Sequence, residues 1–291
     1  MHIVLHTGAH FTEEERLMKC LLRNKEDFSR RGVAVPGPGR YRRLLRETFG
    51  ALKETEPTED AREVLLDAIL DQENAERVIL SNAHFFGAPR SSVNNGQLYP
   101  KAIERLQSLV TLFPDDRIEM FMAMRNPATF LPAAFDRSPK EYIAGFLGGV
   151  LPEEILWSDF FMMVREEFPQ IQITTWCNED APLLWAQIIR EMAGLEPGQK
   201  IIGGFDLLSS IMSREGMQRF RAYLKSHPTM NEMQKRRVMA AFLDKFAIDE
   251  AIEEELDLPG WTEELVERMT TVYDDDMLEV QRIPGVTLIM P

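Results

Sequence analysis

Short apolar runs alternate with amphipathic stretches through the first two-thirds of the chain, and this alternation restricts the fold more than any other feature. Each run has the length of a buried strand and leads into a polar turn. The runs occupy residues 3–5, 77–81, 118–124 and 171–176. Strands separated by helices need crossover connections, which join parallel strands of one sheet. The alternation therefore predicts a three-layer α/β fold, in which helices flank a mainly parallel sheet.

Apolar residues at helical spacing mark the segments between and after these strands. A first helix is expected from Thr12 to about Arg31, with Gly32 as its C-terminal cap. Thr12 and Glu15 fit a capping box, in which each side chain accepts from a free backbone N–H. Residues 88–98 are rich in Ser, Asn and Gly, which predicts a loop able to close over a site. Further helices are expected at residues 59–73, 99–113, 181–192, 206–226, 230–247 and 262–274.

The last third of the chain is mostly helical by the same criterion. A length of 291 residues suits one large α/β domain, or such a domain with a helical addition. We expect residues 1–200 to form the α/β core and residues 201–291 to form a mostly helical region packed on it. The last fifteen residues are expected to be less regular.

Charge and cysteine usage exclude several classes of protein. The formal net charge is −14, which argues against nonspecific nucleic-acid binding and against a polybasic membrane contact. Cys20 and Cys177 do not belong to a C-x-x-C pair, which argues against a disulfide scaffold and a structural zinc site. The longest apolar run, residues 143–151, is interrupted by glycines and is too short to span a bilayer. With no signal-peptide pattern either, these features predict a reduced, cytoplasmic protein with no nucleic-acid or membrane partner, and they leave the oligomeric state open.

The first strand, turn and helix are the place to look for a ligand site. In an open parallel sheet, ligands bind beyond the carboxyl ends of the strands, close to a helix N-terminus. A phosphate site there needs small residues, so that backbone N–H groups wrap the anion, together with a cation and a hydroxyl. The Walker pattern G-x-x-x-x-G-K-[ST] is absent from the sequence. His2, His6 and His10 recur every four residues but pass from strand into loop, so no metal site is expected.

Several segments, in order, resemble the bacterial sulfotransferase-like proteins, which use 3′-phosphoadenylyl sulfate (PAPS) as donor. Residues 5–12 read Leu-His-Thr-Gly-Ala-His-Phe-Thr and resemble the family's N-terminal phosphate loop. Residues 124–127 read Met-Arg-Asn-Pro after an apolar strand and are similar to the family's Arg-[Asp/Asn]-Pro motif. Residues 80–82 and 98–100 are similar to this group as well. The resemblance covers residues 1–195 loosely and implies a P-loop NTPase/sulfotransferase-like fold.

The resemblance also implies which residues would hold the donor. In the family, the arginine of the second motif meets the 3′-phosphate of PAPS or of its spent form, adenosine 3′,5′-bisphosphate, and Arg125 matches it. His84 and His10 are the candidate catalytic residues, because a histidine titrates near neutral pH and can transfer a proton. The acceptor would be a small molecule such as an alcohol or a carbohydrate. The implied donor-binding residues are Thr7, Gly8, Ala9, His10, Thr12 and Arg125.

Several positions depart from the family pattern where its chemistry is expected. Phe11 stands in place of the loop lysine, and Glu13, Glu14 and Glu15 replace small and hydroxyl residues. Sulfuryl transfer builds negative charge on the leaving phosphate, which a lysine neutralises and a phenylalanine does not. Carboxylates at a helix N-terminus also occupy the place of an anionic ligand. The family's helper serine and its glutamate after the Ser-Asn turn are here Ala133 and Ala83.

Three hypotheses for the function stay open. The leading one is a sulfotransferase-like protein whose transfer of sulfuryl groups from PAPS is weakened or lost. The second is an active sulfotransferase with an atypical phosphate loop, and the third is a noncatalytic binding or assembly protein on the same scaffold. The geometry of residues 7–16 decides among them. An open cavity facing Arg125 would favour donor binding, whereas a cavity filled by Phe11 or by the glutamates would not.

Two charged clusters have both a functional and a plain interpretation. The arginines at positions 40, 42, 43 and 46 would either guide an anionic substrate or form a solvated helix face, and we expect the latter. The acidic run from Asp274 to Asp276 would either bind a divalent cation or end a helix in solvent, and again we expect the latter. Core or interface positions are expected for Trp157, Trp176, Trp185 and Trp261.

Overall fold

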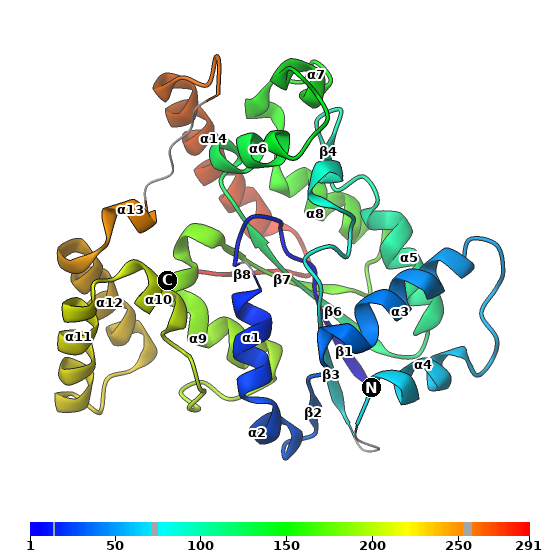
Figure 1. The fold of residues 1–291 in the computed structure, drawn as a ribbon, viewed down its shortest axis with the longest axis horizontal. Helices are drawn as coiled ribbons and strands as arrows, with labels where there is room; N and C mark the ends of the chain where they lie inside the picture. Colours follow the sequence, from blue (N-terminus) through cyan, green and yellow to red (C-terminus); the bar gives the residue numbers. More distant parts are fainter. Residues whose placement is uncertain (14, 72–74, 253–257) are drawn as a thin grey trace.

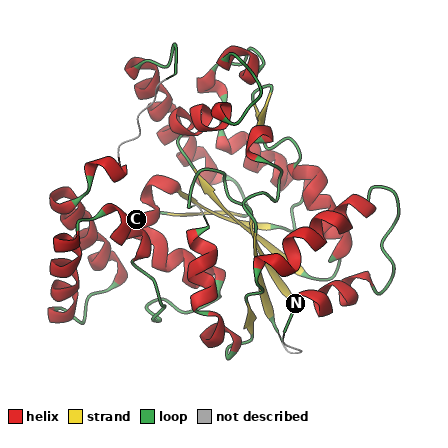
Figure 2. Ribbon diagram, in the orientation of Figure 1, coloured by secondary structure: helices red, strands yellow, loops and turns green. Residues whose placement is uncertain are grey.

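A parallel sheet forms the centre of the molecule. The computed structural model describes residues 1–13, 15–71, 75–252 and 258–291. Within these residues, a six-stranded sheet has the order β2-β3-β1-β6-β7-β8, with all neighbours parallel (Figures 1 and 2). Its strands are β1 (His2–His6), β2 (Val33–Ala34), β3 (Arg77–Ser81), β6 (Arg117–Met124), β7 (Gln172–Cys177) and β8 (Val286–Ile289). A separate antiparallel hairpin consists of β4 (Val93–Asn94) and β5 (Gln97–Leu98).

Helices cover both faces of this sheet. One face packs against α3 (Pro38–Ala51), α4 (Ala61–Ile69), α5 (Ala102–Leu112), α6 (Pro127–Asp136), α8 (Trp157–Glu167) and α14 (Glu263–Arg282). The other face packs against α1 (Arg16–Arg23), α2 (Lys25–Ser29), α9 (Ala181–Met192) and α10 (Asp206–Ile211). The remaining elements are α7 (Ile143–Leu147), α11 (Arg214–Ser226), α12 (Glu232–Phe246), α13 (Asp249–Ile252) and the short 3-10 helices η1 (Pro89–Ser91), η2 (Pro152–Glu154) and η3 (Asn178–Asp180).

The central strand β1 shows why the apolar runs become strands. Ile3 and Leu5 pack into the apolar cluster on one face, and Val4 packs into the cluster on the other. This alternation is the two-residue period of a strand, and a strand covered on both faces is apolar at successive positions. Burying each of these side chains contributes about 1.5–3 kcal/mol. The predicted three-layer α/β fold, with a mainly parallel sheet and helices on both sides, is confirmed.

The central sheet contains two strands that the apolar runs did not predict. β2 has two residues and β8 has four, and such lengths are too short to show a periodic pattern. β8 pairs with β7 over Ile173 to Trp176. The prediction of an irregular end to the chain is therefore wrong, since α14 continues to Arg282 and β8 follows it.

The first predicted helix is two helices that start later than expected. α1 begins at Arg16 rather than at Thr12, and Asn24 separates it from α2. The Asn24 amide donates to the carbonyl oxygens of Cys20 and Ile202 at 2.8 and 2.9 Å, and its Oδ1 accepts from the Ile202 N–H. Asparagine side chains compete with helical hydrogen bonds in this way, which explains the break.

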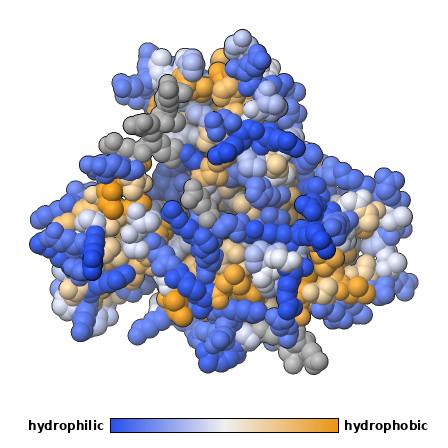
Figure 3. All heavy atoms as spheres, viewed as in Figure 1, coloured by the Kyte–Doolittle hydropathy of each residue, from blue (hydrophilic) through white to orange (hydrophobic). Residues whose placement is uncertain are grey.

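The C-terminal part is rich in helices, as expected. α10, α11 and α12 enclose a smaller apolar cluster that includes Leu208, Phe220 and Met239, and in Figure 1 α11 and α12 stand to one side of the sheet. The division at residue 200 stays a prediction, and β8 from the second range belongs to the central sheet. Hydrophilic side chains cover most of the face seen in Figure 3. Among the helices described, none is long and apolar enough to cross a membrane.

The acidic run in α14 has a structural role that we did not expect. Asp276 is buried rather than solvated, and its carboxylate accepts the backbone N–H groups of Trp157 at 2.7 Å and Ser158 at 3.3 Å. These are free donors at the start of α8, so the carboxylate caps that helix from a distant part of the chain. The Trp157 indole N–H in turn donates to the Arg125 carbonyl oxygen at 2.9 Å. The contact fixes the backbone of Arg125 at the end of β6.

Candidate functional site

The carboxyl ends of β1, β3 and β6 meet where the strand order reverses. β1 has β3 on one side and β6 on the other, which is the place where open α/β sheets bind ligands. Figure 1 shows the segment between β1 and α1 looping beyond these strand ends. The candidate site therefore comprises this loop at residues 7–15, the segment after β3 at residues 82–91, and Arg125 directly after β6.

Backbone N–H groups of the loop are bonded inside the protein. Thr7 and Ala9 donate to carbonyl oxygens of β6 at 3.0 and 3.2 Å, so the loop extends the β1–β6 ladder. The His10 N–H donates to the Tyr99 hydroxyl at 3.0 Å. At Gly8, φ is +102°, and a Cβ there would lie 3.3 Å from the His10 nitrogen, so only glycine fits without strain. These donors do not form the ring of free amides that a bound phosphate needs.

Glu13 fills the position that an anion would take at the start of α1. The residue is 6% exposed, and its Oε2 accepts from the Leu17 N–H at 3.1 Å. Leu17 is in the first turn of α1, where backbone donors lack helical partners. The chain therefore supplies its own carboxyl group to the helix N-terminus.

Burial sets the protonation of Glu13 and of its neighbour His6. Desolvation raises the pKa of Glu13 to about 7. Desolvation, followed by the positive charge of Arg42, lowers the pKa of His6 to about 3. The nearest atoms, His6 Nε2 and Glu13 Oε1, are 3.9 Å apart, and because the imidazole is neutral near pH 7 this contact is not an ion pair. His6 Nδ1 lies 2.9 Å from the Ser81 hydroxyl, which ties the end of β1 to β3.

The predicted capping box is wrong. The Thr12 hydroxyl donates to the Ala9 carbonyl oxygen at 2.8 Å and does not cap α1. Glu15 has φ of 65°, and its carboxylate binds Arg42 at 2.8 Å. The loop turns at Glu15 before α1 begins, and the side chain that bonds to the first turn of α1 is that of Glu13. Glu14 lies outside the described residues.

The side chain of Arg125 contacts the backbone of the loop. Its guanidinium group donates to the Phe11 carbonyl oxygen at 2.6 Å and to the Thr129 hydroxyl at 2.9 Å, and the residue is 7% exposed. The ring of Phe11 packs edge-on against Phe130 of α6. The arginine therefore links the loop to the start of α6, and the aromatic side chain occupies apolar space rather than providing a charge.

The two candidate histidines lie close together in different surroundings. The His10 and His84 ring centroids are 5.2 Å apart. His10 is buried, with Nδ1 3.2 Å from the Tyr99 hydroxyl and Nε2 3.2 Å from the Gly87 carbonyl oxygen. Desolvation, followed by the influence of His84, lowers the pKa of His10 to about 4. A neutral ring that donates from Nε2 and accepts at Nδ1 satisfies both contacts, which favours a structural role for His10. His84 is exposed.

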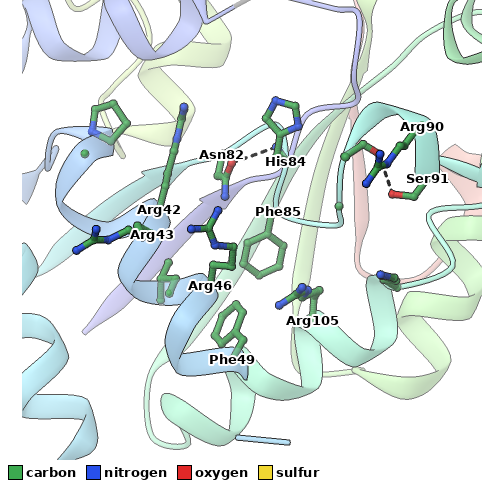
Figure 4. A pocket seen from close by; sticks show the side chains of 16 residues that line it. Arg42, Arg43, Arg46, Phe49, Asn82, His84, Phe85, Arg90, Ser91 and Arg105 are labelled. Carbon is green, nitrogen blue, oxygen red and sulfur yellow. Dashed lines mark hydrogen bonds between the residues drawn. The ribbon is translucent and has the colours of Figure 1, made fainter. Parts of the chain in front are cut away.

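A basic pocket opens next to this loop. It is a cavity of about 830 Å³ between α3, the segment after β3 and the start of α5 (Figure 4). Sequence reasoning noted the arginines of α3 and His84, but it missed the basic residues that η1 and α5 bring to the same cavity, since only the fold places them together. The charged and polar side chains of the pocket are Arg42, Arg43, Arg46, Asn82, His84, Arg90, Ser91, Lys101 and Arg105.

Known proteins give little direct guidance. No protein-family model and no curated protein matches the chain. A similar solved structure is that of retinol dehydratase in complex with androsterone and the inactive cofactor PAP, with a TM-score of 0.31 and 14% sequence identity. That match covers 97% of this chain and 83% of the other. Likeness at this level says nothing about ligand or activity, which must be argued from the residues of this chain.

Proposed function

We propose that this chain is a sulfotransferase-like protein in which the phosphate loop no longer accepts PAPS, so that sulfuryl transfer is lost. The observation that carries the proposal is the buried Glu13 carboxyl group at the N-terminus of α1. Two further observations agree with it. Thr7, Ala9 and His10 use their N–H groups within the protein, and Phe11 stands where the resemblance places a lysine.

The free energies involved are large enough to decide the outcome. To admit a phosphate, the loop would have to release the Glu13 contact and three backbone hydrogen bonds. At about 1 kcal/mol for each neutral bond, the total is on the order of 4 kcal/mol. That is roughly a thousandfold loss of affinity. The new phosphate contacts would have to exceed this without a lysine in the loop.

An active transferase would need a general base that accepts a proton from the acceptor molecule. His10 is a poor candidate, because both ring nitrogens already have partners and its pKa is low. His84 is accessible but lies on the side of the basic pocket, and its catalytic role stays a prediction. Loss of sulfuryl transfer therefore agrees best with the side chains around the loop.

Calorimetry with adenosine 3′,5′-bisphosphate and with PAPS tests the proposal. We expect that neither nucleotide binds to the wild-type protein through a site that includes Arg125. A micromolar dissociation constant that disappears in Arg125→Ala would overturn the closed-loop proposal. Arg137→Ala is the matched control. Arg125 lies just before α6 and Arg137 lies just after it, but the side chain of Arg137 is 65% exposed.

Sulfated product provides the second measurement. Incubation with PAPS and a panel of alcohols and carbohydrates should give no sulfated product above the level without protein. Product formation that is lost in His84→Ala would instead favour the active transferase.

A further inference from the structure

The basic pocket has a charge opposite to that of the chain. Acidic residues outnumber basic ones by 47 to 33 in the sequence, yet the pocket's lining contains six cations and no Asp or Glu. The cations come from three separate elements, α3, η1 and the start of α5. A concave surface lined by one sign of charge concentrates ligands of the opposite sign.

Several of these cations are not neutralised by the protein. Arg42 is bound to Glu15, and Arg43 lies 3.5 Å from Glu47. Among the described residues, by contrast, the side chains of Arg46, Arg90 and Lys101 make no hydrogen bond or ion pair. The charges are therefore available to a ligand.

Arg105 adds a buried donor to the same wall. Its Nε is buried and has no hydrogen-bond partner in the part of the chain that the structure describes. The guanidinium lies 5.9 Å from the centre of the Phe49 ring, which supports its position. A buried N–H without a partner is unfavourable, and an anionic oxygen would satisfy it.

The geometry is held in place without a ligand. The Tyr41 hydroxyl donates to the Ser81 carbonyl oxygen at 2.6 Å, and the Arg42 Nε donates to the same oxygen at 3.0 Å. These bonds fix α3 to the end of β3. In Figure 4, Arg46 extends toward Asn82 and His84, and Arg90 lies on the opposite side of the space. The rings of Phe49 and Phe85 are buried between them and form an apolar floor.

We propose that the basic pocket binds a small molecule that carries two or more sulfate or phosphate groups. Cations on opposite walls suit an anion with separated charged groups, and arginine binds such oxygens with paired N–H groups. A volume of about 830 Å³ suits a disaccharide or a molecule of similar size. The acidic remainder of the surface disfavours an extended polyanion such as nucleic acid. The proposal goes beyond the closed phosphate loop and does not depend on it, since no lining residue belongs to residues 7–13.

The test is calorimetry of the full chain with three sugars at low ionic strength. Sucrose octasulfate supplies sulfate groups, fructose 1,6-bisphosphate supplies phosphate groups, and sucrose is the uncharged control. We expect micromolar binding of at least one anionic sugar, weakened by added salt, and no binding of sucrose. The tighter of the two anionic sugars identifies which group the pocket prefers.

Variants locate the binding. The double variant Arg46→Gln, Arg90→Gln should weaken it by about a hundredfold or more, since two charge-assisted contacts are lost together. Arg30→Gln changes an exposed arginine directly after α2; it is the matched control and should leave sugar binding unchanged. Thermal unfolding checks that all variants fold. No binding of either anionic sugar, or equal affinity in the double variant, overturns the proposal.

Arg125→Ala separates this test from that of the phosphate loop. Sugar binding in the basic pocket should be unaffected by it, whereas donor binding in an open loop would be lost. Failure of one proposal can therefore be recognised without reference to the other.

Discussion

The carboxyl group of Glu13 lies at the N-terminus of α1, where it accepts the Leu17 N–H. A carboxyl group at that place has two ways to be accommodated, as a charge stabilised by the helix dipole or as a neutral acid. Burial favours the neutral form, which is why the pKa of Glu13 rises to about 7. Near neutral pH, Glu13 therefore fills the N-terminus of α1 without bringing a full negative charge into the protein.

The pH dependence of stability follows from this shift. The ordinary pKa of the carboxyl is 4.5, so the unfolded chain has lost this proton above about pH 4.5. The folded protein retains it up to about pH 7. The contribution of Glu13 to the free energy of unfolding therefore falls as pH rises through this window and is constant above it. Glu13→Gln cannot titrate, so its stability relative to wild type should increase by about 2–3 kcal/mol across the window. Urea unfolding at a series of pH values measures the difference.

The neighbouring His6 acts in the opposite direction. Its pKa is lowered from 6.5 to about 3, so its contribution is present above pH 6.5 and is lost as pH falls toward 3. Both proteins contain His6, and its effect cancels in the comparison. A constant difference between the two proteins from pH 4.5 to 7 would show that Glu13 is not buried as described.

The sequence was a good guide to the site's composition and a poor one to its contacts. Phe11 and the glutamates were recognised as departures from a phosphate loop, because residue type alone carries that information. Which glutamate turns inward could not be predicted, since that depends on the backbone path through Glu15. The role of Tyr99 as partner of His10 depends on a contact across 89 residues of chain, and no local pattern reveals it.

At the scale of elements, α14 stabilises α8 through one buried side chain. Asp276 accepts two N–H groups at the start of α8, and the first turn of that helix has a buried Trp157 that reaches the end of β6. The sequence predicts a solvated helix end for the acidic run, and its three identical residues do not show which one is buried. Only the packing of α14 against α8 distinguishes the buried residue from its neighbours.

Removal of this cap should destabilise the protein. We expect Asp276→Ala to lower the free energy of unfolding by about 1–3 kcal/mol, because two buried donors lose their acceptor. Asp276→Asn retains one carbonyl oxygen and should lose less. Urea denaturation measures both, with the exposed neighbour in Asp275→Ala as control. Equal stability of the Asp276→Ala and Asp275→Ala variants would contradict the capping role.

Most elements long enough to show a period were predicted well, and short ones were not. An exception is the single helix expected at residues 206–226, which is two helices, α10 and α11. The runs at β1, β3, β6 and β7 were found, because burial on both faces requires successive apolar residues. β2 and β8 were not, since two and four residues fit many patterns. The single helix expected at residues 12–31 failed for another reason, because the side chain of Asn24 bonds to Ile202 from a distant segment.

For the whole molecule, β8 joins the C-terminal part of the chain to the central sheet. Ile289 is paired in register with Trp176 of β7 and is 4% exposed. Its side chain packs in the same apolar cluster as α1 and α9, so it connects segments from the beginning, middle and end of the sequence.

Ile289→Ala should therefore destabilise the entire fold rather than release one strand. We expect the free energy of unfolding to fall by about 2–5 kcal/mol, from lost burial and the cavity left behind. Thr287→Ala, an exposed position on the same strand, is the control and should change little. The measurement is urea unfolding followed both by tryptophan fluorescence and by circular dichroism. Separate transitions by the two probes would contradict a single cooperative unit.

The pairing of β7 with β8 also has a consequence for synthesis. The ribosome makes β7 more than a hundred residues before β8, since Trp176 is paired with Ile289. At about 5–20 residues per second, the outer edge of β7 waits roughly 5–20 s for its neighbour. An unpaired strand edge in an emerging chain can bind other extended chains. The pairing of β7 with β8 is therefore the last of the central sheet to form during synthesis, once residues 286–289 have left the ribosome.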